Sequence, residues 1–106
     1  MKKCSKCGEV KALGAALPRD FTTKDWRAAQ KFFNNKCAYC GAKGKMTQDH
    51  FIPVKKGGGY TRDNIVPACG SCNCSKGAKD PYKWLVTKKL EFLTYVRVKQ
   101  YLESRL

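Results

Sequence analysis

The sequence lacks any apolar stretch long enough to cross a membrane, and it contains few acidic residues. No run approaches the ~18 apolar residues of a spanning helix, and the basic start Met1-Lys2-Lys3 is not followed by the apolar segment of a signal peptide. We therefore expect an intracellular protein with no membrane partner. Only 8 Asp and Glu stand against 22 Lys and Arg, which gives a formal net charge of +14. This excess favours nucleic acid as the partner, since neutralising phosphates releases counterions, and a solvated basic surface without a partner is the alternative.

The chain also lacks internal repeats, low-complexity tracts and a sign of a second domain. At 106 residues it has the size of one small domain, for which a hydrophobic core alone gives modest stability and a structural metal is useful. We expect a single domain over residues 1–106, in which a central unit at 37–79 follows an N-terminal knuckle and helix at 1–36. A helical segment at 80–106 completes the chain.

Two helical segments are expected to flank the central unit. The first helix begins after Thr22 or Thr23, either of which can cap it, and ends near Asn34-Asn35. The second begins at Asp80-Pro81, with Asp as the N-cap and Pro at the first helical position. The β-branched pair Val86-Thr87 indicates where this second helix could break. We expect the second segment to pack on the first and to shield the central unit.

The central unit has the pattern of a strand, a loop, a short strand and a helix. A strand is predicted over 46–53 and a brief second strand over 65–67, with the glycine-rich tip 57–59 between them. The helix is predicted over 69–76, with Ser71 or Asn73 available as its cap, and Gly77 stops it.

Seven cysteines are present, and six of them form three CxxC pairs. The odd number and the lack of an export signal argue against a disulfide framework and favour metal binding. Four thiolates complete the tetrahedral shell of zinc, and a two-residue gap lets one turn present both sulfurs of a pair. The second and third pairs lie 28 residues apart and enclose an Asp-His dipeptide. We expect a structural zinc bound by Cys37, Cys40, Cys69 and Cys72.

The first pair, Cys4 and Cys7, leaves alternatives open. It could replace either of the other pairs, bind an additional metal together with Cys74 and one more ligand, or remain reduced near the surface. Cys74 is unpaired by spacing, and we expect it to be a buried free thiol.

Beyond the cysteines, the central unit carries an ordered series of motifs. They are Cys37-x-x-Cys40, Asp49-His50-Phe51-Ile52-Pro53, Lys56-Gly57-Gly58, Asn64-Ile65-Val66-Pro67 and Cys69-x-x-Cys72-Asn73-x-x-Lys76-Gly77. In this order and spacing the segment resembles the HNH endonucleases, over about two fifths of the chain. The resemblance implies a small zinc-stabilised α+β domain with a ββα-metal core, in which two antiparallel strands and a helix surround a divalent cation. It further implies an enzyme that hydrolyses DNA phosphodiester bonds, in a phage or bacterial cell.

The resemblance also assigns roles to four polar residues. His50, the only histidine, would be the general base, and Asn64 would hold the loop after the first strand and fix the His50 ring. Asp49 and Asn73 would be oxygen ligands of Mg²⁺ or Mn²⁺. Adjacent strand residues point to opposite faces, so Asp49 and His50 need a strand end or a bulge to address one site.

Each assignment has a simpler alternative. His50 could be structural or a zinc ligand, Asn73 could be a helix cap, and Asn64 could be an ordinary turn residue. Candidate phosphate contacts, each of which could equally be plain surface charge, are Lys55, Lys56, Arg62, Lys76 and Lys79. The competing function is a zinc-stabilised module that binds nucleic acid without cutting it. A redox or zinc-handling role is disfavoured by the charge and by the lack of a thioredoxin-like βαβ pattern. The oligomeric state, monomer or homodimer, stays open.

Overall fold

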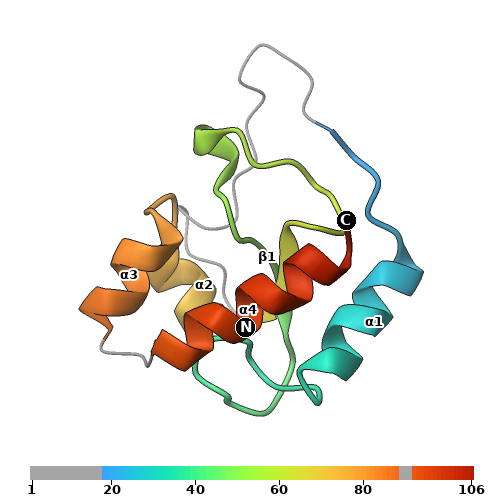
Figure 1. Ribbon diagram of the computed structural model, residues 1–106. Helices are drawn as coiled ribbons and strands as arrows, with labels where there is room; N and C mark the ends of the chain where they lie inside the picture. Colours follow the sequence, from blue (N-terminus) through green and yellow to red (C-terminus); the bar gives the residue numbers. More distant parts are fainter. Residues whose placement is uncertain (1–17, 89–91) are drawn as a thin grey trace.

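The computed structural model describes residues 18–88 and 92–106 as a small α+β fold around a two-stranded sheet (Figure 1). Cys4 and Cys7 lie outside the described residues. None of the helices in the described part has the length and apolar character that a membrane crossing requires. The elements in chain order are α1 (Thr23–Phe32), β1 (Thr47–His50), the 3₁₀ turn η1 (Val54–Lys56), β2 (Ile65–Ala68), α2 (Gly70–Lys76), α3 (Pro81–Thr87) and α4 (Phe92–Ser104).

The helix α1 begins and ends where local chemistry favours it. Thr22 is the N-cap, and it exchanges hydrogen bonds with Asp25 in a capping box, so Thr22 and not Thr23 has the capping role. After the helix, Asn34 and Asn35 both have positive φ, at 56° and 58°. Asparagine tolerates this left-handed conformation better than most residues, and the chain turns there toward Cys37.

The strands β1 and β2 form an antiparallel pair with His50 opposite Ile65 and Thr47 opposite Ala68. β1 is shorter than the strand predicted over 46–53, because the chain leaves the ladder after His50 and enters η1. β2 lies entirely in the core, with every residue buried. His50 is therefore the last residue of β1, and a strand end is one of the two arrangements expected to let Asp49 and His50 address one site.

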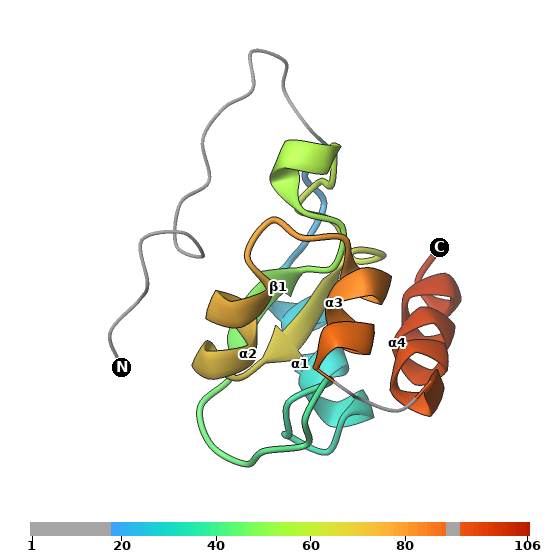
Figure 2. The same ribbon diagram turned by 90° about the vertical axis from the view of Figure 1, so that its left-hand side faces the viewer.

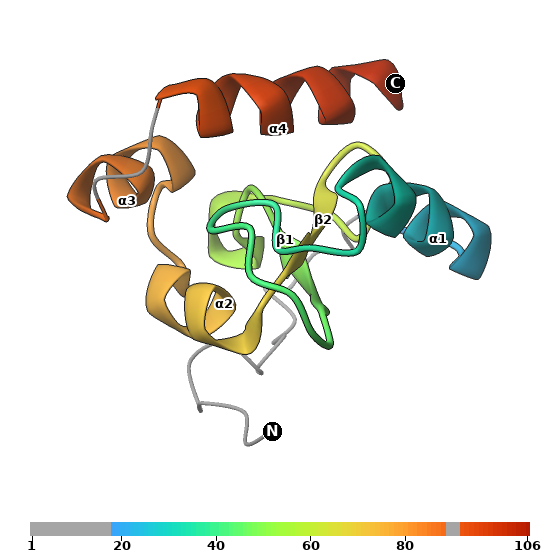
Figure 3. The same cartoon turned by 90° about the horizontal axis from the view of Figure 1, so that it is seen from below.

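The helix α2 follows β2 directly and is capped by a cysteine. The Cys69 side chain is the N-cap and accepts a hydrogen bond from the Cys72 amide, so the predicted caps Ser71 and Asn73 are wrong. Gly77 ends the helix with a φ of +50°, in agreement with the predicted stop. The hairpin lies between α2 on one side and α4 on the other (Figures 2 and 3).

In its described residues, the C-terminal segment contains two helices, and α3 ends at the β-branched pair Val86-Thr87. The later helix packs on α1, since the Tyr101 ring lies 4.9 Å from that of Phe32 and 5.4 Å from that of Phe33. The prediction that this segment covers α1 is confirmed. The buried residues of α4 are Val98, Tyr101 and Leu102, whereas Leu93 is 69% exposed.

Candidate metal centre and active site

Four cysteine sulfurs converge where the loop after α1 meets the start of α2. The Sγ atoms of Cys37, Cys40, Cys69 and Cys72 all lie within 4.8 Å of one another. The Cys40 and Cys69 sulfurs are 3.7 Å apart, and tetrahedral zinc with Zn–S bonds of about 2.3 Å requires a separation of about 3.8 Å. The predicted four-cysteine cluster is confirmed, and its geometry fits zinc.

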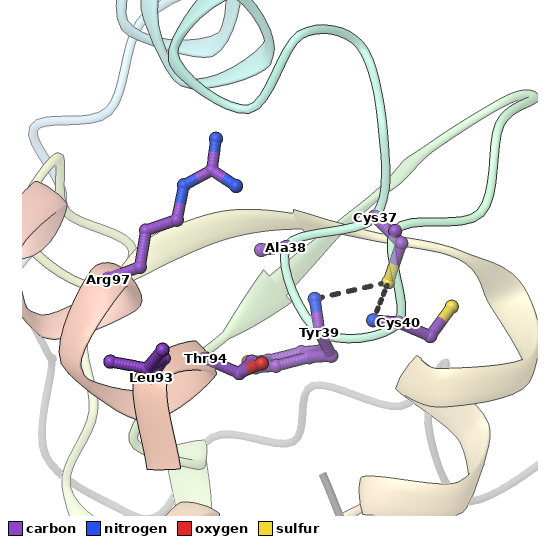
Figure 4. A pocket seen from close by; sticks show the side chains of 8 residues that line it. Cys37, Ala38, Tyr39, Cys40, Leu93, Thr94 and Arg97 are labelled. Atoms are coloured by element: carbon purple, nitrogen blue, oxygen red, sulfur yellow. Dashed lines mark hydrogen bonds between the residues drawn. The ribbon is translucent and has the colours of Figure 1, made fainter. Parts of the chain in front are cut away.

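Backbone amides surround these sulfurs as they would surround thiolates. The Cys37 sulfur accepts from the amides of Tyr39 at 3.4 Å and Cys40 at 3.5 Å (Figure 4), and the Cys69 sulfur accepts from Cys72 at 3.4 Å. A hydrogen bond from Cys72 and these amides lower the pKa of Cys37 to about 4, while the same pairing raises the pKa of Cys72. The lowered pKa favours the thiolate form of Cys37, which is the form that binds a metal ion.

A pocket of about 290 Å³ lies beside this cysteine turn, bordered by Leu93 and Arg97 of α4 (Figure 4). None of the residues predicted to be catalytic lines it. The pocket is therefore separate from the predicted active site.

Cys74 differs from its prediction as a buried free thiol. Its side chain is partly exposed, and the residue is disulfide-bonded. Two residues beyond the buried Cys72, Cys74 points to roughly the opposite face of α2, because each helical residue turns the chain by about 100°.

The two faces of β1 have different surroundings. Thr47 and Asp49 face α2, where Asn73 contacts Thr47 and Lys76 contacts Asp49. Gln48 and His50 alternate to the other face, where the Tyr60 hydroxyl donates to the Gln48 side chain at 2.6 Å. Asp49 and His50 therefore lie side by side at the strand end with different neighbours.

Asp49 is buried and is bound through one oxygen. Its Oδ2 accepts a 2.5 Å hydrogen bond from the Tyr39 hydroxyl and lies 3.3 Å from the Lys76 ammonium. Burial raises the pKa of Asp49 and lowers the pKa of Lys76, while the attraction between the two groups opposes both shifts. Burial and the Asp49 charge hold the pKa of Tyr39 far above its usual range, so its hydroxyl stays protonated and donates.

Lys76 is fully buried, which excludes the predicted contact with phosphate. Its ammonium donates to the main-chain carbonyl of His50 at 2.7 Å in addition to its pairing with Asp49. The prediction failed because a sequence motif does not show that this lysine lies on the inner face of α2. The other candidate phosphate contacts are exposed, namely Lys55, Lys56, Arg62 and Lys79.

Asn64 is buried in the loop that connects η1 to β2, and its amide bridges the two sides of that loop. Its Oδ1 accepts from the Ile52 amide at 2.8 Å, and its Nδ2 donates to the carbonyls of Ile52 at 3.1 Å and Gly59 at 3.0 Å. The main-chain oxygen of Asn64 also accepts from the Phe51 amide at 2.8 Å. These bonds hold the chain that follows directly after His50.

His50 is the last residue of β1 and is partly exposed. Its ring centroid lies 6.0 Å from that of Tyr60, a neighbour that sequence reasoning did not identify. Burial, and secondarily the charge of Lys76, lower the pKa of His50 below that of a free histidine. The imidazole is therefore poised to be neutral near neutral pH, as a general base must be.

Asn73 and Asp49 together offer two oxygens of the kind that hard cations bind. The Asn73 nitrogen donates to Thr47 Oγ1 at 2.9 Å and to the Gln48 carbonyl at 3.5 Å. Within the described residues, neither Asn73 Oδ1 nor Asp49 Oδ1 has a hydrogen bond. Both residues line the space between β1 and α2, and a carboxylate with an amide oxygen suits Mg²⁺ or Mn²⁺.

Comparisons with known proteins agree with this architecture. The family model described as HNH endonuclease matches residues 37–79. We refer to residues 37–79, which match this family model, as the HNH segment. This HNH segment contains both strands, α2, all four clustered cysteines and the four polar residues predicted to form the active site, which are Asp49, His50, Asn64 and Asn73.

Two curated relatives resemble the HNH segment and its surroundings. The SPbeta prophage-derived protein YoqL of Bacillus subtilis (strain 168), whose name assigns it to the HNH endonucleases, is 37% identical over 68 residues. That alignment covers 54% of this chain and 30% of YoqL. The CRISPR-associated endonuclease Cas9 of Corynebacterium diphtheriae is 36% identical over 62 residues, which cover 55% of this chain and 6% of Cas9. The chain thus spans less than a third of the length of either relative.

Proposed function

We propose that the HNH segment hydrolyses phosphodiester bonds of DNA with Mg²⁺ or Mn²⁺, by nicking or by double-strand cutting. The observation that carries this proposal is the match of an HNH endonuclease model to the residues that form the β1–β2–α2 unit. The excess of basic residues supports a polyanionic substrate. The prophage origin named for YoqL supports an intracellular setting.

In this proposal His50 takes a proton from the attacking water, since no other histidine exists in the chain. Asn64 keeps the chain after His50 in place through its bonds to Ile52 and Gly59. Asp49 and Asn73 would hold the cation, which when bound offsets the charge that grows on the phosphate and the leaving oxygen. The exposed basic residues Lys55, Lys56, Arg62 and Lys79 would contact phosphates and position the strand.

A plasmid assay tests the proposed activity. Purified protein should convert supercoiled DNA to relaxed or linear forms with Mg²⁺ or Mn²⁺, and EDTA should stop the conversion. A preparation that contains zinc, binds DNA and leaves the plasmid intact in every metal tested would contradict the proposal.

A non-catalytic module that binds nucleic acid is the second candidate. The observation that favours it is the burial of Asp49, whose carboxylate is already paired with the Lys76 ammonium. A gel-shift measurement beside the plasmid assay separates the two candidates. The binding module predicts retention of DNA that is indifferent to EDTA, with no cleavage, whereas the nuclease predicts cleavage that depends on the cation.

A further inference from the structure

Two side chains from different elements bind the same oxygen of Asp49. Tyr39 belongs to the turn between Cys37 and Cys40, and Lys76 lies in the last turn of α2. Both are buried, Tyr39 at 3% and Lys76 at 0% exposure. Because both donors approach Oδ2, the orientation of the carboxylate is set and its second oxygen is left without a hydrogen bond among the described residues.

Lys76 makes a second contact at the same place. Its ammonium donates to the His50 carbonyl at 2.7 Å, and this residue is the last in β1. One lysine therefore holds the carboxylate of Asp49 and the main chain of His50 together. A continuous series of contacts runs from the cysteine turn through Tyr39 and Asp49 to Lys76 and then to His50.

Stability alone gives a weak reason for this arrangement. Burying a carboxylate and an ammonium costs desolvation energy that their attraction only partly returns, and apolar residues of similar volume often stabilise a protein as well or better. The pair also fixes the orientation of the Asp49 carboxylate. Groups that hydrogen-bond to a metal ligand determine the direction of the oxygen that is left to bind the metal.

We propose that Tyr39 and Lys76 are positioning residues of the HNH site, which orient Asp49 and fix the main chain at His50. This inference rests on the proposed nuclease function. Both side chains are almost fully buried, so they would act through Asp49 and His50 and not through a contact with DNA. The turn that carries the zinc ligands is thereby coupled to the active site by the Tyr39 hydroxyl.

Tyr39→Phe is the sharpest test, because it removes one hydroxyl and leaves the Asp49–Lys76 pair in place. We expect kcat for plasmid cleavage to fall about 10- to 100-fold, the usual effect of losing a partner of a metal ligand. KM for DNA and the zinc content should equal those of the unchanged protein. Tyr82→Phe is the matched control, since Tyr82 is exposed on α3, and it should leave kcat unchanged.

Lys76→Met provides a second variant of similar length without the charge. It should lower kcat without weakening DNA binding, whereas a phosphate contact would have weakened binding. Should this variant fail to fold, Tyr39→Phe still decides the question. A Tyr39→Phe protein that melts earlier but keeps the original kcat would show a structural role only and would overturn the proposal.

Binding of Mn²⁺, measured by calorimetry without DNA, separates this inference from the nuclease proposal. The unchanged protein should bind Mn²⁺, and Tyr39→Phe should bind it about 10- to 100-fold more weakly. Cation binding that responds to Tyr39→Phe in a protein that cuts no DNA would contradict the nuclease proposal while supporting the positioning role. Equal Mn²⁺ affinity in both proteins would overturn the positioning role.

Discussion

Asp49 and His50 are adjacent in the chain but have different surroundings, because successive strand residues point to opposite faces. Asp49 is 4% exposed and bound to Tyr39 and Lys76, whereas His50 is partly exposed beside Tyr60. The strand ends at His50, so this residue is not enclosed by further sheet. One residue step thus separates a buried carboxylate from a partly exposed imidazole.

The shifted pKa of His50 predicts the pH dependence of cleavage. A general base works in its neutral form, and both burial and the nearby Lys76 charge disfavour the protonated form, which lowers the pKa. As the pH falls, His50 should remain neutral longer than a free histidine, so the acid limb of the kcat/KM profile should lie below about pH 6.5. Rates measured across the pH range at fixed metal concentration check this. An acid limb above the value of free histidine would contradict the assignment of the base or its environment.

Single residues also show which parts of the candidate site could be predicted from the sequence and which could not. The clustered cysteines followed from their spacing, which one zinc ion dictates. The burial of Lys76 did not follow, because lysine is almost always exposed unless it is paired, and its partner Asp49 lies 27 positions earlier in the chain. Tyr39 carried no signal at all, since an aromatic residue between two cysteines suggests only packing.

At the scale of the elements, α1 and α4 form a supporting layer for the HNH segment. Phe33 follows α1 and is buried against Tyr101 of α4, while Arg97 lies 5.2 Å above the Phe33 ring. α1 also packs against β2, whose residues are all buried. The helices outside residues 37–79 therefore cover the hairpin that carries the candidate site.

Removing the Phe33 ring should weaken this layer. Phe33→Ala is expected to lower the free energy of unfolding by about 3–5 kcal/mol, through lost burial and the cavity left behind. Leu93→Ala on α4 is the control, and it should change stability by about 0.5 kcal/mol or less because Leu93 is 69% exposed. Denaturant titration of both variants checks the difference, and equal effects would contradict the packing of α4 on α1.

The four clustered cysteines could join the cysteine turn to the start of α2 through one metal ion. We expect about one zinc per chain by elemental analysis, and we expect Cys72→Ser to lose it and to destabilise the fold, since the metal binds only the folded arrangement. Ser71 is exposed and lies between Cys69 and Cys72, so Ser71→Ala should keep the zinc. A Cys72→Ser protein with full zinc content would show that another ligand set holds the metal.

Element boundaries were predicted where local chemistry decides them. The start of α1 after a capping threonine, the start of α3 at Asp80-Pro81 and the stop at Gly77 all match the structure. The predicted length of β1 was too long. After His50 the Ile52 amide donates to the Asn64 side chain, and the chain then enters the turn η1. These tertiary hydrogen bonds join residues 12 positions apart, so local propensity could not reveal them.

On the scale of the whole molecule, helices lie on both sides of the hairpin of the HNH segment. One is α2, which belongs to this segment, and α4 lies on the opposite side (Figure 3). The chain carries a net charge of +14, and its described exposed basic residues include Lys55, Lys56 and Arg62 on the loop that follows His50. The basic side chains that would attract a polyanion therefore lie on the loop that directly follows His50, the candidate base.

The most direct test of the nuclease account compares the cleavage rate of the unchanged protein with that of His50→Ala. Both proteins are supplied with saturating Mg²⁺ and are matched for zinc content, thermal stability and DNA occupancy. We predict that the unchanged protein cuts plasmid DNA and that His50→Ala binds it equally but cuts it at least about 100-fold more slowly, as expected for the loss of a general base. Equal cleavage rates for the two proteins would contradict the account.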